Sequence, residues 1–397
     1  FLLSFVPVYG ALLSVGGSAA GALSYQTTLL SAAQLLGAFV KAAVMPVLCC
    51  SLALGCVDRL EAAGIPAFGP TAYAAQMEAS KIFSKNLMRK YGIPTAKSET
   101  FTEMDKALAY LDTQGAPIVV KADGLALGKG VVVAATVEEA KQAVVEMMQG
   151  GKFGQSGARV LIEECMVGRE VTVLCFCDGK TIVPMKASQD HKRALDGDKG
   201  PNTGGMGAYS PVPQIGQDVI DTAIETIVKP TVQAMADEGT PFTGILYAGL
   251  IATADGPKVI EFNARFGDPE TEVVLPKLTS DLGAGINAIL NDETPEFTWD
   301  EDNATLGVVL ASDGYPTNVV KGAAIPEIKV DDDSHVYYAG VTRGEHGLVA
   351  NSGRVLFVET SAADIKTAQD KVYGIIDKLD TTGMFYRHDI GFKALNA

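Results

Sequence analysis

The stretch "QDHKRALDGDKGPNTGGMGAYSP" (189–211) gathers acids, cations and an imidazole directly before a run of glycines. Its ionisable residues are Asp190, His191, Lys192, Arg193, Asp196, Asp198 and Lys199. Taken alone, such a stretch is more often a solvated surface loop with a turn than a functional loop. Its meaning therefore depends on what the rest of the chain supplies.

A second group of polar residues lies in "VIEFNARFGDPETE" (259–272). Strand alternation would place Glu261 and Asn263 on one face and their apolar neighbours on the other. A carboxylate and an amide oxygen are hard ligands that suit Mg²⁺ and leave positions for phosphate oxygens. An exposed strand edge is the simpler alternative. It is disfavoured because the charge continues beyond the strand, through Arg265, Asp268 and Glu270.

The segment "KADGLALGKG" (121–130) lies between two predicted strands and carries Gly124, Gly128, Gly130, Lys121 and Lys129. Its spacing is not that of a Walker A loop, and no helix follows directly. Glycines let a backbone approach phosphates closely, and lysines offset their charge. A phosphate-covering lid and a flexible hairpin are both compatible with this pattern.

Three acids occur in "LIEECMVGRE" (161–170), namely Glu163, Glu164 and Glu170. Acids at a strand end can accept hydrogen bonds from a ribose, although a plain hairpin is the commoner meaning of such a segment.

Length and composition limit the class of protein. The 397 residues, 47% of them hydrophobic, provide material for two or three domains with buried cores. A formal net charge of −15 argues against general affinity for nucleic acids or acidic membranes. The six cysteines show neither a disulfide ladder nor zinc-ligand spacing, which favours reduced thiols in a cytoplasmic protein.

The first 57 residues are unusual because Lys41 is their only charged residue. Membrane spans are one explanation, but small and polar residues interrupt the apolar runs throughout. The short runs better suit buried strands and helices, so we expect an α/β unit packed on the rest of the protein.

The remaining pattern predicts mixed helices and strands. Helices are expected at 72–91, 137–149, 217–237 and 362–379. Strands are expected at 116–123, 130–136, 158–165, 169–177, 181–188, 244–253, 257–264, 304–312, 335–341 and 354–360.

Taken together and in order, these strings resemble the ATP-grasp ligases, and among them the phosphoribosylamine–glycine ligase family. The resemblance runs from about Gly64 to the carboxy terminus and includes "YRHDIGFKAL" (386–395). It implies an α/β and α+β multidomain protein with an ATP-grasp fold. The expected parts are a Rossmann-like preATP-grasp domain (1–75), an ATP-grasp domain (76–298) with a lid at about 116–184, and a mixed α/β domain (299–397).

The resemblance also implies a reaction. ATP, with Mg²⁺ or Mn²⁺, would activate the glycine carboxylate as glycyl phosphate, and the amine of 5-phosphoribosylamine would displace the phosphate. The product would be glycinamide ribonucleotide, in purine biosynthesis. The expected partners are these small molecules alone, with no nucleic acid and no membrane, for a cytoplasmic monomer.

Site residues follow from the resemblance position by position. The metal would be bound by Glu261 and Asn263. The nucleotide would be bound by Lys81, Lys121, Gly124, Gly128, Lys129, Gly130, Glu163, Glu164, Glu170, Asn202, Gly204 and Gly205. Glycine and the reacting phosphate would be held by Asp190, His191, Lys192, Arg193 and Asp196, with Arg265 neutralising the acyl phosphate.

The chain departs from the family pattern near its start. "VGGSAAGAL" (15–23) keeps glycines but lacks the Arg, Glu and His that hold the phosphoribosyl substrate in the family. A nucleotide-binding module with an impaired phosphoribosylamine site therefore stays open as an alternative. A second alternative is another ATP-grasp carboxylate–amine ligase or carboxylase, which would share the 259–272 strand but not the 189–211 loop.

Overall fold

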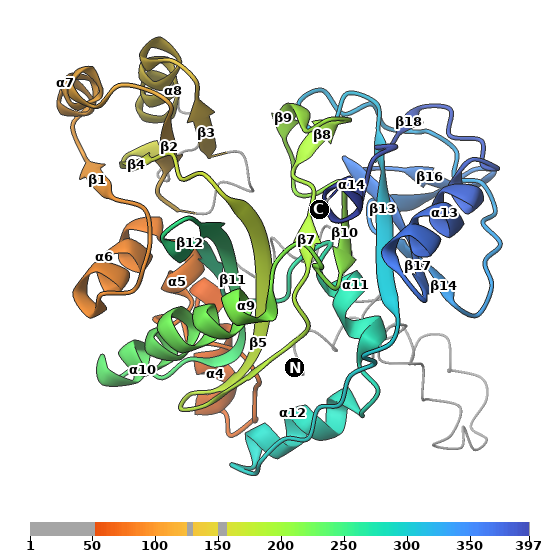
Figure 1. The fold of residues 1–397 in the computed structure, drawn as a ribbon, viewed down its shortest axis with the longest axis horizontal. Helices are drawn as coiled ribbons and strands as arrows, with labels where there is room; N and C mark the ends of the chain where they lie inside the picture. Colours follow the sequence, from red (N-terminus) through yellow and green to blue (C-terminus); the bar gives the residue numbers. More distant parts are fainter. Residues whose placement is uncertain (1–51, 125–129, 150–156, 397) are drawn as a thin grey trace.

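The computed structural model describes residues 52–124, 130–149 and 157–396. The unit predicted for the first 57 residues lies almost wholly outside the described residues, as do Gly128 and Lys129. The described elements form three neighbouring groups, which Figure 1 shows at the upper left, the lower left and the right.

The helix predicted at 72–91 is two helices, so the sequence-based prediction of one element is wrong. After α4 (Cys56–Ala62), α5 (Gln76–Ala79) ends at Ser80, where the backbone is extended, and α6 (Lys81–Tyr91) begins. The Ser80 side chain accepts a hydrogen bond from the Phe83 amide and so caps α6. Gly92, in the left-handed region, ends this helix.

The small unit, at the upper left of Figure 1, is an antiparallel sheet of order β1-β4-β2-β3 with two helices. Its strands are β1 (Ser98–Phe101), β2 (Ile118–Ala122), β3 (Val131–Ala134) and β4 (Val160–Glu164). Its helices are α7 (Met104–Gln114) and α8 (Val137–Met148). A separate hydrophobic core fills this unit, with Leu111, Val120 and Ile162 fully buried. β2 is buried along its whole length because helices cover the sheet.

The central sheet has the order β12-β11-β5-β6 and lies below the small unit in Figure 1. Its strands are β5 (Arg169–Asp178), β6 (Ile182–Pro184), β11 (Thr243–Thr253) and β12 (Gly256–Asn263). Helices α9 (Gln217–Ala223) and α10 (Lys229–Asp237), joined by a π-helical turn (Ile224–Val228), pack near it. Cys175 and Cys177 of β5 are fully buried free thiols.

The C-terminal sheet has the order β14-β17-β13-β10-β7, with β18 paired to β13. Its strands are β7 (Gln189–Asp190), β10 (Gly207–Ser210), β13 (Ala304–Ser312), β14 (Ser334–Tyr338), β17 (Arg354–Ala362) and β18 (Met384–Phe385). Two hairpins accompany it, β8 (Arg193–Leu195) with β9 (Lys199–Asn202), and β15 (Val341–Gly344) with β16 (Gly347–Ala350). The nearby helices are α11 (Thr271–Val274), α13 (Ile365–Ile376) and α14 (Phe392–Leu395). Helix α12 (Leu282–Leu290) lies at the bottom of Figure 1, against Phe297, which stacks on Phe176 of β5.

The groups of strands that pair in the three sheets do not coincide with the domain limits predicted from the sequence. The sheet and core of the small unit span 98–164, so β1 and α7 belong with the lid predicted at 116–184, whereas β5 and β6 pair in the central sheet. Likewise β10, expected in the part ending at 298, pairs with β13 of the part beginning at 299, and β7 joins the same sheet through β10. The chain between 189 and 210 therefore connects two sheets.

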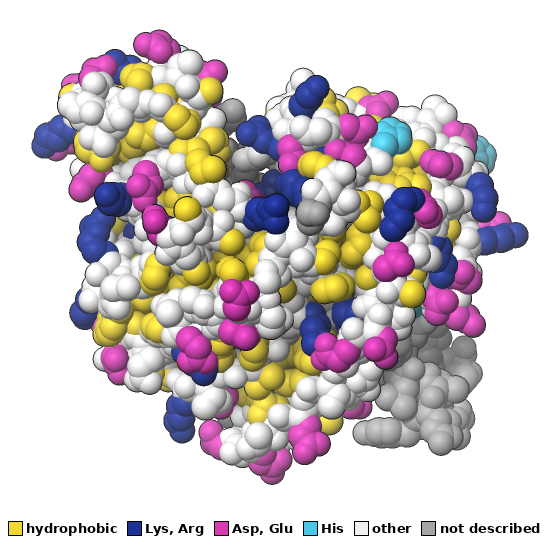
Figure 2. All heavy atoms as spheres, viewed as in Figure 1, with side chains coloured by type: hydrophobic (Ala, Val, Ile, Leu, Met, Phe, Trp, Pro, Cys, Tyr) yellow, Lys and Arg dark blue, Asp and Glu magenta, His cyan; other side chains and the backbone are white. Residues whose placement is uncertain are grey.

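On the face drawn in Figure 2, basic side chains gather in the hollow between the small unit and the C-terminal sheet. Within the described ranges, the longest apolar helices are too short or too polar to cross a bilayer.

Candidate functional site

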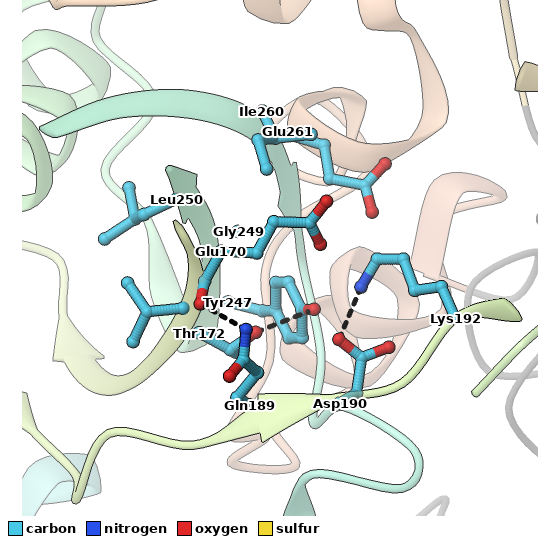
Figure 3. Close-up of a pocket in the computed structure, with 11 residues that line it drawn as sticks. Glu170, Thr172, Gln189, Asp190, Lys192, Tyr247, Gly249, Leu250, Ile260 and Glu261 are labelled. Atoms are coloured by element: carbon cyan, nitrogen blue, oxygen red, sulfur yellow. Dashed lines mark hydrogen bonds and ion pairs between the residues drawn. The ribbon is translucent and has the colours of Figure 1, made fainter. Parts of the chain in front are cut away.

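A small pocket opens where β5, β11 and β12 meet β7 and the residues that follow it (Figure 3). It is lined by Glu170, Val171, Thr172, Gln189, Asp190, Lys192, Tyr247, Gly249, Leu250, Ile260 and Glu261. Three strings noted in the sequence, at 161–170, 189–211 and 259–272, therefore converge on one place.

The charged groups of the pocket face one another. The Lys192 ammonium lies 2.6 Å from Asp190 Oδ1, and the carboxylates of Glu170 and Glu261 point toward the same region (Figure 3). Burial disfavours the charged form of Lys192, but the nearby acids, Asp190 foremost, raise its pKa well above the usual value. Lys192 is therefore a cation at neutral pH, held among acids at the pocket wall.

A buried acid lies behind this wall. The Tyr247 hydroxyl donates to Glu270 Oε1 at 2.7 Å and accepts from the Thr172 hydroxyl at 3.1 Å. Burial, followed by the negative charge of Asp190 as the second cause, raises the pKa of Glu270 to about 7. Its charge state thus depends on whether the neighbouring pocket holds a cation or an anion.

The two metal ligands predicted from the sequence lie together on β12. Glu261 and Asn263 are both half-buried, and they pair with Gly249 and Tyr247 of β11. Arg265 extends alongside, with its Nη2 3.4 Å from Asn263 Oδ1 and its Nε 3.0 Å from a carboxylate oxygen of Glu78.

This donor set fits a hard divalent cation. One carboxylate and one amide oxygen leave several positions for phosphate oxygens and water, as Mg²⁺ sites usually do. Across the described residues there is no cluster of three or more His, Cys, Asp or Glu that could form an all-protein metal cage.

Two lysines share one carboxylate beneath the pocket. Glu163 of β4 lies 3.1 Å from the Lys85 ammonium of α6 and 2.8 Å from the Lys121 ammonium of β2. All three side chains are at most 6% exposed. Burial alone would raise the pKa of Glu163, yet the two lysines lower it below the usual value. Burial lowers the pKa of Lys85 to about 8. We call these three residues the lysine–glutamate triad.

Residues 123 and 124, at the start of the glycine-rich segment 121–130, are hydrogen-bonded to the residues between α5 and α6. Asp123 Oδ1 accepts from the Ser80 hydroxyl at 3.0 Å and from the Ile82 amide at 3.1 Å. Lys81 donates to the Gly124 carbonyl at 3.1 Å, and Gly124 itself has a φ of +99°. At the far end, the Gly130 carbonyl accepts from the Ala122 amide. The extended residue that divides the two helices thus provides an anchor for this loop.

The hairpin β8–β9 is bound to a carboxy-terminal segment rather than directed into the pocket. Arg387, fully buried, contacts Asp389 through two nitrogens (2.7 and 2.9 Å) and Asp198 at 2.7 Å, and it also donates to the Arg193 carbonyl. Asp196 accepts from the backbone and ring of His388. We call residues 387–393 the anchor segment, because it holds the hairpin in place.

His191 also faces the anchor segment. Its ring is fully buried, and its Nε2 accepts a long 3.4 Å hydrogen bond from the Gly391 amide. Burial, with the charges of Lys393 and Arg387, lowers its pKa to about 3. The imidazole is therefore neutral at neutral pH, and it is absent from the residues that line the pocket.

The glycine turn after the hairpin is clamped between two other segments. Gly205 has a φ of +115°, and a Cβ there would lie 2.5 Å from the Pro269 Cδ. Arg354 donates to the Gly204 carbonyl and pairs with Asp268, both at 2.9 Å. Glycine is required at 205 for conformation and for space.

The residues predicted from the sequence thus fall into separate places. The pocket contains Asp190, Lys192, Glu170 and Glu261, with Asn263 and Arg265 further along the same chain segment. Lys121 and Glu163 belong to the buried triad, and Glu164 is exposed, accepting from the Lys97 amide. Arg193, Asp196 and Asn202 belong to the hairpin, away from the residues lining the pocket.

Sequence reasoning missed Lys85, Tyr247 and Arg354, and it noted Glu270 and Arg387 only as members of the strings 259–272 and 386–395, without a role. Lys85 carried a usable signal, because it follows Lys81 by one helical turn and so shares a helix face with it. The partners of the others are distant in sequence, and no local pattern indicates them.

The chain matches two family models, "Phosphoribosylglycinamide synthetase, ATP-grasp (A) domain" over residues 79–271 and the C domain of the same family over 305–393. It is 56% identical to the phosphoribosylamine–glycine ligase of Streptococcus pyogenes over 347 residues, which cover 87% of this chain and 82% of the relative. The Streptococcus pneumoniae ligase is 54% identical with the same coverage.

Solved structures show the same similarity. The phosphoribosylamine–glycine ligase of Thermotoga maritima superposes with a TM-score of 0.74 at 34% identity, covering 81% of each chain. A biotin carboxylase domain from Hydrogenobacter thermophilus, solved with MgADP, shares the fold alone, with a TM-score of 0.65 at 14% identity over 83% of this chain and 72% of that one.

Proposed function

The chain belongs to the phosphoribosylamine–glycine ligase family, and we propose that its substrates meet at the pocket between β5, β7, β11 and β12. The family and the ATP-grasp fold, predicted from the strings at 121–130, 189–211, 259–272 and 386–395 taken together, are thereby confirmed. The protein is a ligase of purine biosynthesis that joins glycine to 5-phosphoribosylamine at the expense of ATP. The assignment of individual residues that follows is our proposal.

In this reaction the glycine carboxylate attacks the γ-phosphate of ATP, and ADP leaves. The amine of 5-phosphoribosylamine then attacks the acyl carbon of glycyl phosphate and displaces phosphate. Both steps need the reacting groups held in line and their negative charge neutralised, rather than covalent help from the protein. A site that combines cations, a metal position and a few ordered acids meets these needs.

Glu261 and Asn263 would hold a divalent metal ion, which supplies charge neutralisation at the phosphate oxygens when bound. We propose Mg²⁺, with Mn²⁺ as a substitute. The small number of protein donors favours Mg²⁺, and the related biotin carboxylase domain was solved with MgADP.

Lys192 is the cation best placed to meet a carboxylate or phosphate in the pocket. Asp190 fixes its ammonium at 2.6 Å, and the surrounding acids keep it charged. Glu170 and Asp190 are then available to accept hydrogen bonds from an amine or ammonium group of a substrate. Arg265 lies beside the metal ligands and would neutralise the acyl phosphate.

Lys81 and Lys121 would contact the nucleotide phosphates, with Gly124 to Gly130 as the covering loop. Glu163 was expected beside the adenosine. Its burial between two lysines instead supports a role in arranging those lysines. His191, Arg193 and Asp196 would support the pocket through the anchor segment rather than by contact with substrate. We further propose a monomer that acts on these small molecules alone.

The convergence of Asp190, Lys192, Glu170 and Glu261 carries this proposal, and replacing Glu261 by Gln tests it. We expect the rate of ADP formation to fall at least ~100-fold, as for loss of a preorganised electrostatic contact. ADP formation should be measured with glycine and 5-phosphoribosylamine together and with each omitted. Glu99→Gln, an exposed glutamate on β1, is the matched control. Wild-type turnover in Glu261→Gln at limiting Mg²⁺ would refute the metal assignment.

A further inference from the structure

The lysine–glutamate triad contains two ammonium groups and one carboxylate, so it carries one net positive charge in a buried place. Burying an uncompensated charge is unfavourable, because the protein interior solvates it poorly. An anion that completes this arrangement would therefore be bound favourably. The anion must reach one of the two lysines.

The two lysines differ in the hydrogen bonds still available to them. Lys85 directs its ammonium at three protein oxygens: Thr95 Oγ1 at 2.6 Å, the Ala96 carbonyl at 3.3 Å and Glu163 Oε1 at 3.1 Å. Two hydrogen bonds and one ion pair thus direct the Lys85 ammonium at protein oxygens, and none of these oxygens belongs to a residue that lines the pocket.

Lys121 contacts only two oxygens among the described residues, Glu163 Oε2 at 2.8 Å and the Ile260 carbonyl at 3.1 Å. It therefore keeps one N–H donor for another acceptor. Ile260 lines the pocket and precedes Glu261, so the Lys121 ammonium lies against the pocket wall beside the metal ligands. An acceptor in this position is expected to be an anion that enters the pocket.

We propose that Lys85 is a positioning residue for ATP binding, which neutralises Glu163 and so leaves Lys121 free to bind a nucleotide phosphate. If Lys85 were absent, Glu163 would be paired with Lys121 alone. The triad would then be neutral. Glu163 would already compensate the charge of the Lys121 ammonium, so Lys121 would attract a phosphate less strongly. This inference rests on the proposed contact between Lys121 and the nucleotide.

The test compares variants that differ in the net charge of the triad, so that an effect of charge can be separated from the loss of a side chain. Wild type carries one net positive charge in the triad, Lys85→Met carries none, and the double variant Lys85→Met/Glu163→Gln again carries one. We expect Lys85→Met to raise the Kd for a non-hydrolysable ATP analogue, and the KM for ATP, roughly ten- to hundredfold, the range of a charge-assisted hydrogen bond. The KM for glycine should not change. The double variant should recover most of the lost affinity.

If Lys85 has a purely structural role, the double variant should bind ATP no better than Lys85→Met, because it lacks two buried partners. That result would overturn the inference. Lys90→Met, an exposed lysine on the same helix, is the matched control. If Lys85→Met does not fold, Glu163→Gln decides. It is expected to bind the analogue at least as tightly as wild type, and a tenfold weaker Kd would contradict the proposal.

Lys121→Met separates this inference from the proposed function. Wild-type affinity for the analogue in Lys121→Met would remove the phosphate contact on which both depend. Weak binding in Lys121→Met together with wild-type binding in Lys85→Met would overturn the role of Lys85 alone.

Discussion

At the scale of single residues, local spacing predicted the metal ligands well. Glu261 and Asn263 are two positions apart on a strand, and this period is fixed by the geometry of the backbone. The role of His191 could not be read in this way. Its neighbours Asp190 and Lys192 line the pocket, whereas its own ring faces Gly391, which is 200 residues distant. Only the tertiary fold determines which of three consecutive side chains meets the substrate.

The buried His191 makes folding stability depend on pH. Its pKa is lowered from 6.5 to about 3 in the folded state, so the unfolded chain takes up a proton below about pH 6.5 while the folded protein does not. The free energy of unfolding should therefore fall as the pH is lowered, by up to ~1.4 kcal/mol per pH unit. His191→Gln should show a shallower slope in urea unfolding between pH 7 and 5. His346→Gln, at an exposed histidine, should keep the wild-type slope; equal slopes in all three proteins would contradict the argument.

At the scale of elements, the helices and strands expected at 137–149, 217–237, 304–312 and 354–360 lie close to their observed limits, because their apolar periodicity is a local property. Helices α7 and α12 and the short strands β1, β7 to β10, β15, β16 and β18 were not predicted. Two further differences have an identifiable cause. The helix expected at 72–91 is interrupted at Ser80 by hydrogen bonds involving Asp123, a residue of another element. The hairpin β8–β9 was expected to be a substrate loop, yet its acids bind Arg387 and His388. Both differences arise from partners that are distant in sequence.

The hairpin provides a test of the anchor segment. Arg387→Met should leave Asp389 without its cation and Asp198 with Lys393 alone, and lower the free energy of unfolding by about 1–3 kcal/mol, because both acids are partly exposed. Amide hydrogen exchange should become faster across 193–202. The control is Arg343→Met, at an exposed position on β15. Unchanged exchange in the hairpin would show that Arg387 does not hold it.

At the scale of the whole molecule, the described chain has one large hydrophobic core shared by the central and C-terminal sheets, a second core inside the small unit, and a third, small cluster of Leu52, Val57, Ala67 and Ala75. The sequence indicated several domains but placed their limits differently, because a strand's partner in the sheet cannot be read from its own residues. Because the small unit has a core of its own, we expect it to unfold locally without the rest of the protein.

Leu111 is fully buried in the core of the small unit. Leu111→Ala should destabilise that unit by about 2–5 kcal/mol. We expect faster hydrogen exchange in α7, α8 and β1 to β4, with β11 and β13 retaining wild-type protection. Leu310→Ala, in the large core, should give the reverse pattern. Equal acceleration everywhere in Leu111→Ala would mean that the two cores unfold together.

The anchor segment also determines when the enzyme can become active during its synthesis. The hydrogen bond from the Gly197 amide to Asp389 joins residues 192 positions apart. At a translation rate of about 5–20 residues per second, roughly 10 to 40 s separate the emergence of the two. During this interval the hairpin β8–β9 lacks its contacts with the anchor segment. A growing chain can thus complete the small unit early, but its ligation site is assembled only after residues 387–393 have left the ribosome.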